Sequence, residues 1–108
     1  MITETRWSEP ALLSLAEVLH YTIEIHGEEQ YRKLRKKVMD AVQRISAMPY
    51  MCAVEPCSAA VGVELRGCVV IPKIKIIYSV AGDVLFIEYV KNTYLSERTM
   101  LERMGYSF

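Results

Sequence analysis

The sequence has little of what marks a secreted, membrane-spanning or disulfide-linked protein. Its 108 residues hold no apolar run near the ~20 residues that a membrane-spanning helix needs. The first six residues lack the basic start and apolar core of a signal peptide, so we expect a cytoplasmic protein. The cysteines at 52, 57 and 68 are odd in number and have no C-x-x-C spacing. We expect buried thiols rather than a disulfide framework, a metal site or a redox site.

The chain also lacks an excess of either charge and the usual signatures of a catalytic or cofactor site. Thirteen basic residues balance thirteen acidic ones, so only a local patch could bind nucleic acid. The sequence contains no glycine-rich phosphate loop, paired catalytic carboxylates or Ser/His/Asp arrangement, and we expect no cofactor. His20 and His26 lie six residues apart on a predicted helix and do not share a face, which argues against a metal pair. This length allows one domain, residues 1–108.

Residues 64–90 concentrate β-branched and aromatic side chains and predict a three-stranded antiparallel meander. Gly82 and Asp83 suit a two-residue hairpin loop, which would fix the register of the last two strands. The pairs expected from this loop are Val80 with Leu85, Tyr78 with Ile87 and Ile76 with Tyr89. One face of the sheet is then almost wholly apolar. The other face carries Lys73, Lys75, Ile77, Ser79, Phe86, Glu88 and Val90, and this half-polar face is where we expect function.

Two amphipathic helices are predicted before the meander. Ser8 is a good N-cap, Pro10 is tolerated in the first turn, and Gly27 ends the first helix. Its apolar stripe is Leu12, Leu15, Ala16, Leu19 and Ile23, widened by Leu13 and Val18, and Trp7 and Tyr21 are expected in the core. The second helix has a seam at Tyr31, Leu34, Val38, Ala41, Ile45 and Met48 and ends at Pro49. A single turn residue between them predicts an antiparallel helical hairpin on the apolar face of the sheet.

Charged residues follow a regular pattern on the second helix. Glu28 and Glu29 lie four residues before Arg32 and Lys33, the favourable order for helix ion pairs. Five cations fall within six positions, at Arg32, Lys33, Arg35, Lys36 and Lys37. This run is either a phosphate-contacting ridge or a solvated helix face.

The remaining segments have weaker patterns. Residues 50–63 show no period and are expected to form a loop. Ser96 could cap a short C-terminal helix with apolar positions Met100, Leu101 and Met104, closed by Gly105. Isolated helices shorter than ~12 residues are marginal in water, so this tail must dock on another surface.

The order of these segments resembles the RelE/ParE superfamily, the toxins of bacterial type II toxin–antitoxin modules. The resemblance covers nearly the whole chain and rests on Pro49, on Leu65-Arg66, and on a hairpin of the form "I-x-Y-x-V-x-G-D-x-x-x-I" at residues 76–87. It implies an α+β fold in which an N-terminal strand within residues 2–7 pairs with the meander, a helical hairpin covers one face of an antiparallel sheet, and a short helix ends the chain.

The resemblance also implies a function and candidate site residues. In the RNA-cleaving branch, a ribosome-dependent mRNA endoribonuclease uses acid–base groups and cations on the sheet to stabilise the phosphorane. The candidates here are Arg66, which matches the family's strand arginine, and Lys73 and Lys75 on one side of the next strand. Tyr94 is the fourth, at the place where the family usually carries Arg or His. A tyrosine can stack or donate a proton, but it cannot supply the missing charge.

Three functions remain open at this point. A toxin of this kind cleaves mRNA on the ribosome or poisons DNA gyrase, and a cognate antitoxin neutralises it. The alternative is a degenerate, non-catalytic toxin that serves as an antitoxin-binding or regulatory module. Arg66 could equally form a structural ion pair with Glu64 or Glu88.

Overall fold

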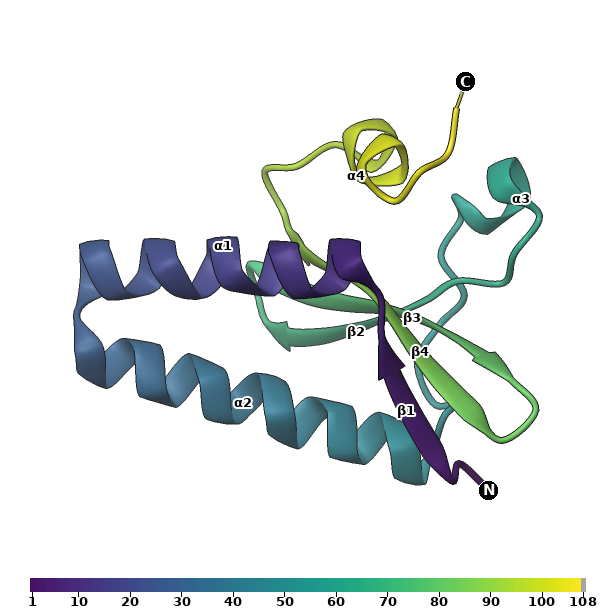
Figure 1. Ribbon diagram of the computed structural model, residues 1–108, viewed down its shortest axis with the longest axis horizontal. Helices are drawn as coiled ribbons and strands as arrows, with labels where there is room; N and C mark the ends of the chain where they lie inside the picture. The colour runs from purple at the N-terminus through teal and green to yellow at the C-terminus, as the bar shows by residue number, and fades with distance from the viewer. Residues whose placement is uncertain (108) are drawn as a thin grey trace.

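The computed structural model describes residues 1–107 and has the α+β architecture expected from the sequence (Figure 1). Its elements in chain order are β1 Glu4–Trp7, α1 Glu9–His26, α2 Glu28–Ala47, α3 Ser58–Val61, β2 Arg66–Ile71, β3 Ile74–Ala81, β4 Val84–Asn92 and α4 Glu97–Arg103. The predicted hairpin, meander and C-terminal helix are all present. The segment 50–63 is not wholly a loop, since it contains the short helix α3.

The four strands form one sheet in the order β1-β4-β3-β2. β2, β3 and β4 are antiparallel neighbours, as predicted. β1 pairs with β4 as expected, but it runs parallel to it, so the sheet is mixed and the prediction of a fully antiparallel sheet is wrong. The two strands lie far apart in the chain, which leaves ample length for the crossover that a parallel pair requires.

The predicted register holds only near the Gly82-Asp83 loop. Val80 pairs with Leu85 and Tyr78 with Ile87, but Ile77 pairs with Tyr89 because the register shifts at this point. Glu88 is the extra residue of a β-bulge, which moves Tyr89 to the face opposite Ile87. Ile76 therefore pairs with Val90, so the predicted partner Tyr89 and the predicted face of Val90 are both wrong.

The first helix begins and ends where predicted, but only part of its predicted stripe, Leu15, Val18 and Leu19, packs against the core. Ser8 caps it by accepting a hydrogen bond from the Ala11 N–H at 3.1 Å, and Gly27 follows it with φ 89°. The buried residues are Ala11, Ser14 and Thr22, whereas Leu12, Leu13, Ala16, Tyr21 and Ile23 are exposed. Small side chains let α1 lie close to β4, and the Ser14 hydroxyl accepts a hydrogen bond from the Val90 N–H at 2.9 Å. The core position expected for Tyr21 is therefore wrong.

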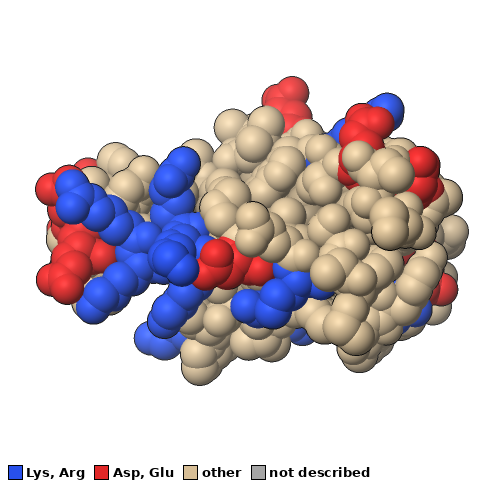
Figure 2. All heavy atoms as spheres, turned by 90° about the horizontal axis from the view of Figure 1, so that it is seen from below, with Lys and Arg blue, Asp and Glu red and all other residues tan. Residues whose placement is uncertain are grey.

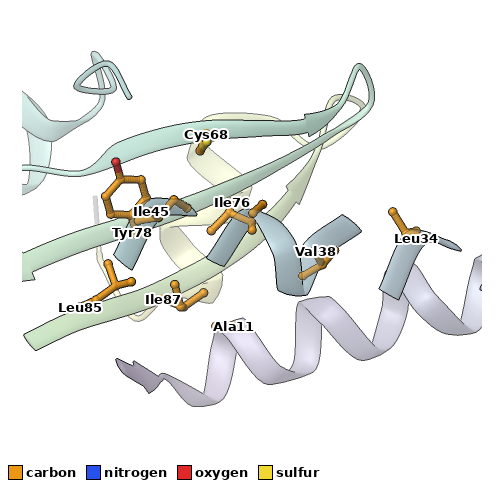
Figure 3. Close-up of a cluster of buried hydrophobic side chains, with 10 residues drawn as sticks. Ala11, Leu34, Val38, Ile45, Cys68, Ile76, Tyr78, Leu85 and Ile87 are labelled. Carbon is orange, nitrogen blue, oxygen red and sulfur yellow. The ribbon is translucent and has the colours of Figure 1, made fainter. Parts of the chain in front are cut away.

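The second helix follows its predicted seam. Leu34, Val38, Ala41 and Ile45 are buried, whereas Met48 caps the helix and is exposed. The four buried residues pack against Ile76, Tyr78, Leu85 and Ile87 of the sheet and against Ala11 of α1 (Figure 3). Trp7 packs at the edge of this core, as expected.

A second core lies on the opposite face of the sheet. It consists of Cys57, Leu65, Ile77, Tyr89, Met100 and Leu101. The Ser96 hydroxyl caps α4 as predicted, accepting a hydrogen bond from the Thr99 N–H at 3.1 Å. The C-terminal helix thus docks on the chain's own sheet and covers part of the face that was expected to be half-polar.

Candidate functional site

Arg66 lies at the start of β2 and is almost fully engaged by its own chain. Its guanidinium donates to the carbonyl oxygens of Tyr50 and Cys52 at 3.3 and 2.7 Å and to one carboxylate oxygen of Glu64 at 3.1 and 2.8 Å. It also lies 5.1 Å from the centre of the Tyr50 ring. The side chain is only 17% exposed. The ion pair with Glu64 is one of the two alternatives expected for Arg66, whereas Glu88 accepts a hydrogen bond from Ser79 instead.

Lys75 lies on β3 and forms a partly buried ion pair with Glu55. Its ammonium nitrogen is 2.9 Å from Glu55 Oε1. Both side chains pass over Gly67, where an added Cβ would come within 2.6 Å of the carboxylate and 2.7 Å of the lysine stem. Gly67 is therefore required for this close approach.

Arg66 and Lys75 lie on opposite faces of the sheet. Arg66 pairs with Tyr78 and so lies on the side of the helical hairpin, whereas Lys75 shares the other side with Gly67 and Ile77. Lys73 is not on a strand, because Pro72 and Lys73 form the turn between β2 and β3. The expectation that Lys73 and Lys75 occupy one polar strand face is therefore wrong.

Lys73 and Tyr94 do come together. The lysine nitrogen lies 5.9 Å from the centre of the exposed Tyr94 ring. They form part of the rim of a groove of about 680 Å³ between the helical hairpin, the β2–β3 turn and the end of β4. Volumes in this range are typical of small-molecule binding sites.

The groove combines an apolar floor with a cationic rim. Val18, Leu34, Ile71, Ile74, Val90 and Leu95 supply the apolar surface, and Lys33, Lys37, Lys73 and Arg103 supply the positive charges. Glu17 is the acidic residue in the lining. Such a surface suits a ligand that carries both negative charges and apolar groups.

The sequence analysis identified some of the residues that line this groove. Lys33 and Lys37 belong to the predicted cationic run, but nothing in their spacing placed them beside Lys73. Arg103, on α4, was missed because the docking position of that helix is set by the fold. Arg103 donates to the Tyr89 hydroxyl at 3.3 Å and lies 3.4 Å from Glu17 Oε2. The hydrogen bond to Tyr89 is the main cause of a raised pKa of Arg103, so its charge is permanent.

The cationic run itself is partly neutralised on the helix. The predicted pairs of Glu28 with Arg32 and Glu29 with Lys33 form at 2.6 and 3.3 Å, and Lys36 lies 3.0 Å from Asp40. Figure 2 shows lysine and arginine side chains gathered on one part of the surface. Exposed pairs of this kind contribute little to stability and exchange readily with other partners.

Within the described residues, 1–107, no group of three or more histidine, cysteine, aspartate or glutamate side chains could hold a metal ion, and no helix is long and apolar enough to cross a membrane. The cysteines are free thiols, buried at 57 and 68 and half-buried at 52.

Comparison with known proteins shows a likeness of fold and no likeness of sequence family. No protein-family model matches the sequence, and no curated protein is significantly similar to it. The fold matches a chain of a solved structure described as "Chromosomal ParDE TA system from P. aeruginosa", with a TM-score of 0.68 and 15% sequence identity. The match covers 85% of this chain and 96% of that chain. The α+β fold predicted from the order of segments is thereby confirmed, and this chain shares it with that chain of the ParDE structure.

Proposed function

We propose that this chain is the toxin of a type II toxin–antitoxin pair and that a cognate antitoxin neutralises it. The observation that carries the proposal is the fold match to a chain of the ParDE structure, because it covers most of both chains. The Arg66 strand and the Gly82-Asp83 hairpin occupy their expected places in this fold, which adds independent support from the sequence.

The groove is the surface that best fits an antitoxin segment. Its lysines and Arg103 would pair with acidic side chains, while its apolar floor would bury apolar ones. An acidic, amphipathic peptide meets both requirements. We therefore place the antitoxin in this groove.

The dispersal of the four candidate residues argues against ribonuclease chemistry. General acid–base catalysis needs groups within hydrogen-bond reach of one reacting atom. Arg66 is engaged by the 50–52 carbonyls and Glu64, Lys75 is paired with Glu55, and these two lie on opposite faces. We infer that the chain acts on DNA gyrase, the target that the resemblance assigns to the ParE branch, rather than cleaving mRNA.

A second candidate function is a non-catalytic module that binds the antitoxin or regulates its expression. The engagement of Arg66 by its own chain supports it equally well, since a binding module needs no free catalytic cation.

Two assays with the purified chain separate these functions. We expect inhibition of supercoiling by gyrase and no cleavage products when primers are extended on mRNA from a cell-free translation reaction. Cleavage at defined mRNA positions would contradict the gyrase proposal and assign the nuclease function. Activity in neither assay would favour the non-catalytic module.

A further inference from the structure

The helical hairpin has an outer face that points away from the sheet. On α1, Leu12 and Ile23 each follow a buried residue by one position, and on α2 the same is true of Arg35 and Met39. One position turns a helix by about 100°, so these side chains point away from the core. Leu12, Ile23 and Met39 are 53%, 40% and 36% exposed.

The outer face is unusual in its apolar content. Four large aliphatic residues of α1 are exposed, namely Leu12, Leu13, Ile23 and Ile25, whereas Leu15, Val18 and Leu19 pack against the core. A helix that served only to cover the sheet would need polar residues, not these four apolar ones, on its solvent side. The arrangement indicates that the outside of α1 is also covered in the assembled state.

The charges of the two helices are opposite. α1 carries Glu9, Glu17 and Glu24 and has neither lysine nor arginine. α2 carries six cations and three acidic residues. Its outer side has a hollow lined by Tyr31, Arg32, Arg35, Lys36 and Met39. Packing α1 on another α1 would bring like charges together, whereas packing α1 on α2 is complementary.

We propose that two copies of this chain pack outer face to outer face about a two-fold axis that runs along the hairpin. This operation lays α1 of each copy antiparallel on α2 of the other, giving a four-helix bundle with two identical contacts. Rotation about this axis leaves every residue at the same position along the length of the hairpin. Ile23 and Tyr31 are each four residues from the Gly27 turn, so Ile23 of one copy meets the hollow of the other.

The same register pairs charges. Glu24 is three residues from Gly27, whereas Arg32 and Arg35 are five and eight residues from it. At 1.5 Å per residue, these arginines of the other copy are offset from Glu24 by about 3 and about 8 Å along the hairpin, which their long side chains can span. In the single chain, Arg35 has no ion-pair partner within the described part, and Glu24 contacts only His20 at 3.2 Å. Both residues are therefore available for an intermolecular pair.

The size of the face sets the strength of the contact. Helices of 18 and 20 residues are about 27 and 30 Å long, and two of them side by side cover roughly 550 Å². This is less than the ~800 Å² per partner of a standard stable interface. We expect a dimer that forms in the micromolar range and dissociates on dilution.

Sedimentation equilibrium of the full chain, from about 1 µM to about 1 mM, tests this proposal. The mean mass should rise from one copy to two. Glu24→Arg and Arg35→Glu should each raise the dissociation constant at least about tenfold, because each places like charges together twice in the dimer. The combined variant E24R/R35E should restore association. Arg98→Glu, an exposed change on α4, is the control and should leave the dissociation constant unchanged.

Thermal unfolding of each variant shows that it remains folded. A chain that stays monomeric up to about 1 mM overturns the proposal. So does a dimer that E24R and R35E do not weaken, or one that the combined variant fails to restore.

Discussion

Arg66 holds together two segments that are distant in sequence. The Arg66 guanidinium donates hydrogen bonds to the carbonyl oxygens of residues 50 and 52. The isolated bridge between Val54 and Arg66 adds a backbone contact at the same point. Arg66 therefore anchors the segment after α2 to the edge strand β2.

Replacing Arg66 by alanine should destabilise the protein by about 1–3 kcal/mol, because a largely buried charged donor to two carbonyl groups is lost. Urea unfolding monitored by circular dichroism measures this change. Arg98→Ala, which removes an exposed i,i+4 pair on α4, should cost less than about 0.5 kcal/mol. Equal stability of the two variants would show that the Arg66 contacts contribute nothing.

Cys68 and Tyr78 are ionisable groups in the first core. Burial is the main cause that raises the pKa of Cys68 to about 11, and a hydrogen bond with Cys52 adds to it. Burial also raises the pKa of Tyr78, whose hydroxyl donates to the Pro49 carbonyl oxygen at 2.8 Å. Both groups are therefore neutral in the fold at pH values where the unfolded chain has begun to lose these protons.

This difference predicts a loss of stability at high pH. Well below pH ~9 both states hold the Cys68 proton, so the free energy of unfolding does not depend on it. Between pH ~9 and ~11 the unfolded state binds fewer protons than the folded state, and stability falls as pH rises. The fall should be shallower in Cys68→Ala, with the remainder supplied by Tyr78 and Cys57, whose pKa values burial also raises. Identical slopes for the two proteins in urea unfolding from pH 7 to 11 would exclude a contribution from Cys68.

At the scale of elements, α4 belongs to the fold rather than to a free tail. Met100 and Leu101 are buried against Ile77 and Tyr89 on the sheet. The bulge at Glu88 makes this possible, because it places Tyr89 on the side that α4 covers. The hydrogen bond from Arg103 to the Tyr89 hydroxyl then fixes the end of the helix.

Met100→Ala should cost about 2–5 kcal/mol, as expected for a large-to-small change in a packed core. Chemical unfolding measures the loss. Met48→Ala is the matched control, because that methionine is 62% exposed and its truncation should cost less than about 0.5 kcal/mol. If both substitutions are equally mild, α4 does not contribute to the global stability of the domain.

The element order, the α1 and α2 boundaries and the α4 cap could be predicted because their signals are local. Ser8, Gly27 and Ser96 act within one turn of the helix that they limit. The stripe of α1 was predicted only in part, at Leu15, Val18 and Leu19. Periodicity selects the largest apolar residues, whereas close packing on β4 selects small ones such as Ala11 and Ser14. The bulge at Glu88 could not be predicted either, because it lies within an unbroken strand-like run of residues.

The candidate site was harder to predict than the fold. Arg66 and Lys75 lie on adjacent strands, but their faces depend on a register that the hairpin loop does not determine. Lys73 was expected on β3 and lies in the turn, next to Tyr94. The groove joins residues of α1, α2, β4 and α4, and only the tertiary structure brings these together.

At the scale of the whole molecule, the net charge is zero, but positive charges cluster in particular regions of the surface. The groove collects Lys33, Lys37, Lys73 and Arg103 over an apolar floor, against Glu17 alone. If an acidic antitoxin segment binds there, Lys33→Gln with Lys37→Gln should weaken the complex about tenfold or more and reduce its salt dependence. Calorimetric titration at two ionic strengths measures both effects.

A matched pair of substitutions makes this test specific. Lys36→Gln with Arg98→Gln also removes two exposed cations, but neither residue lines the groove, so antitoxin affinity should stay within about twofold of the parent protein. Equal losses in the two double variants would mean that the antitoxin responds to net charge and does not occupy the groove.

Growth of bacteria that express this chain tests the proposed function most directly. Colony counts would be followed after induction of the chain alone and together with the product of the neighbouring small reading frame. We expect colony formation to fall on induction of the chain alone and to recover when the neighbouring product is present. Unchanged colony counts on expression of the folded chain, or a loss that the neighbouring product does not relieve, would contradict its assignment as a toxin.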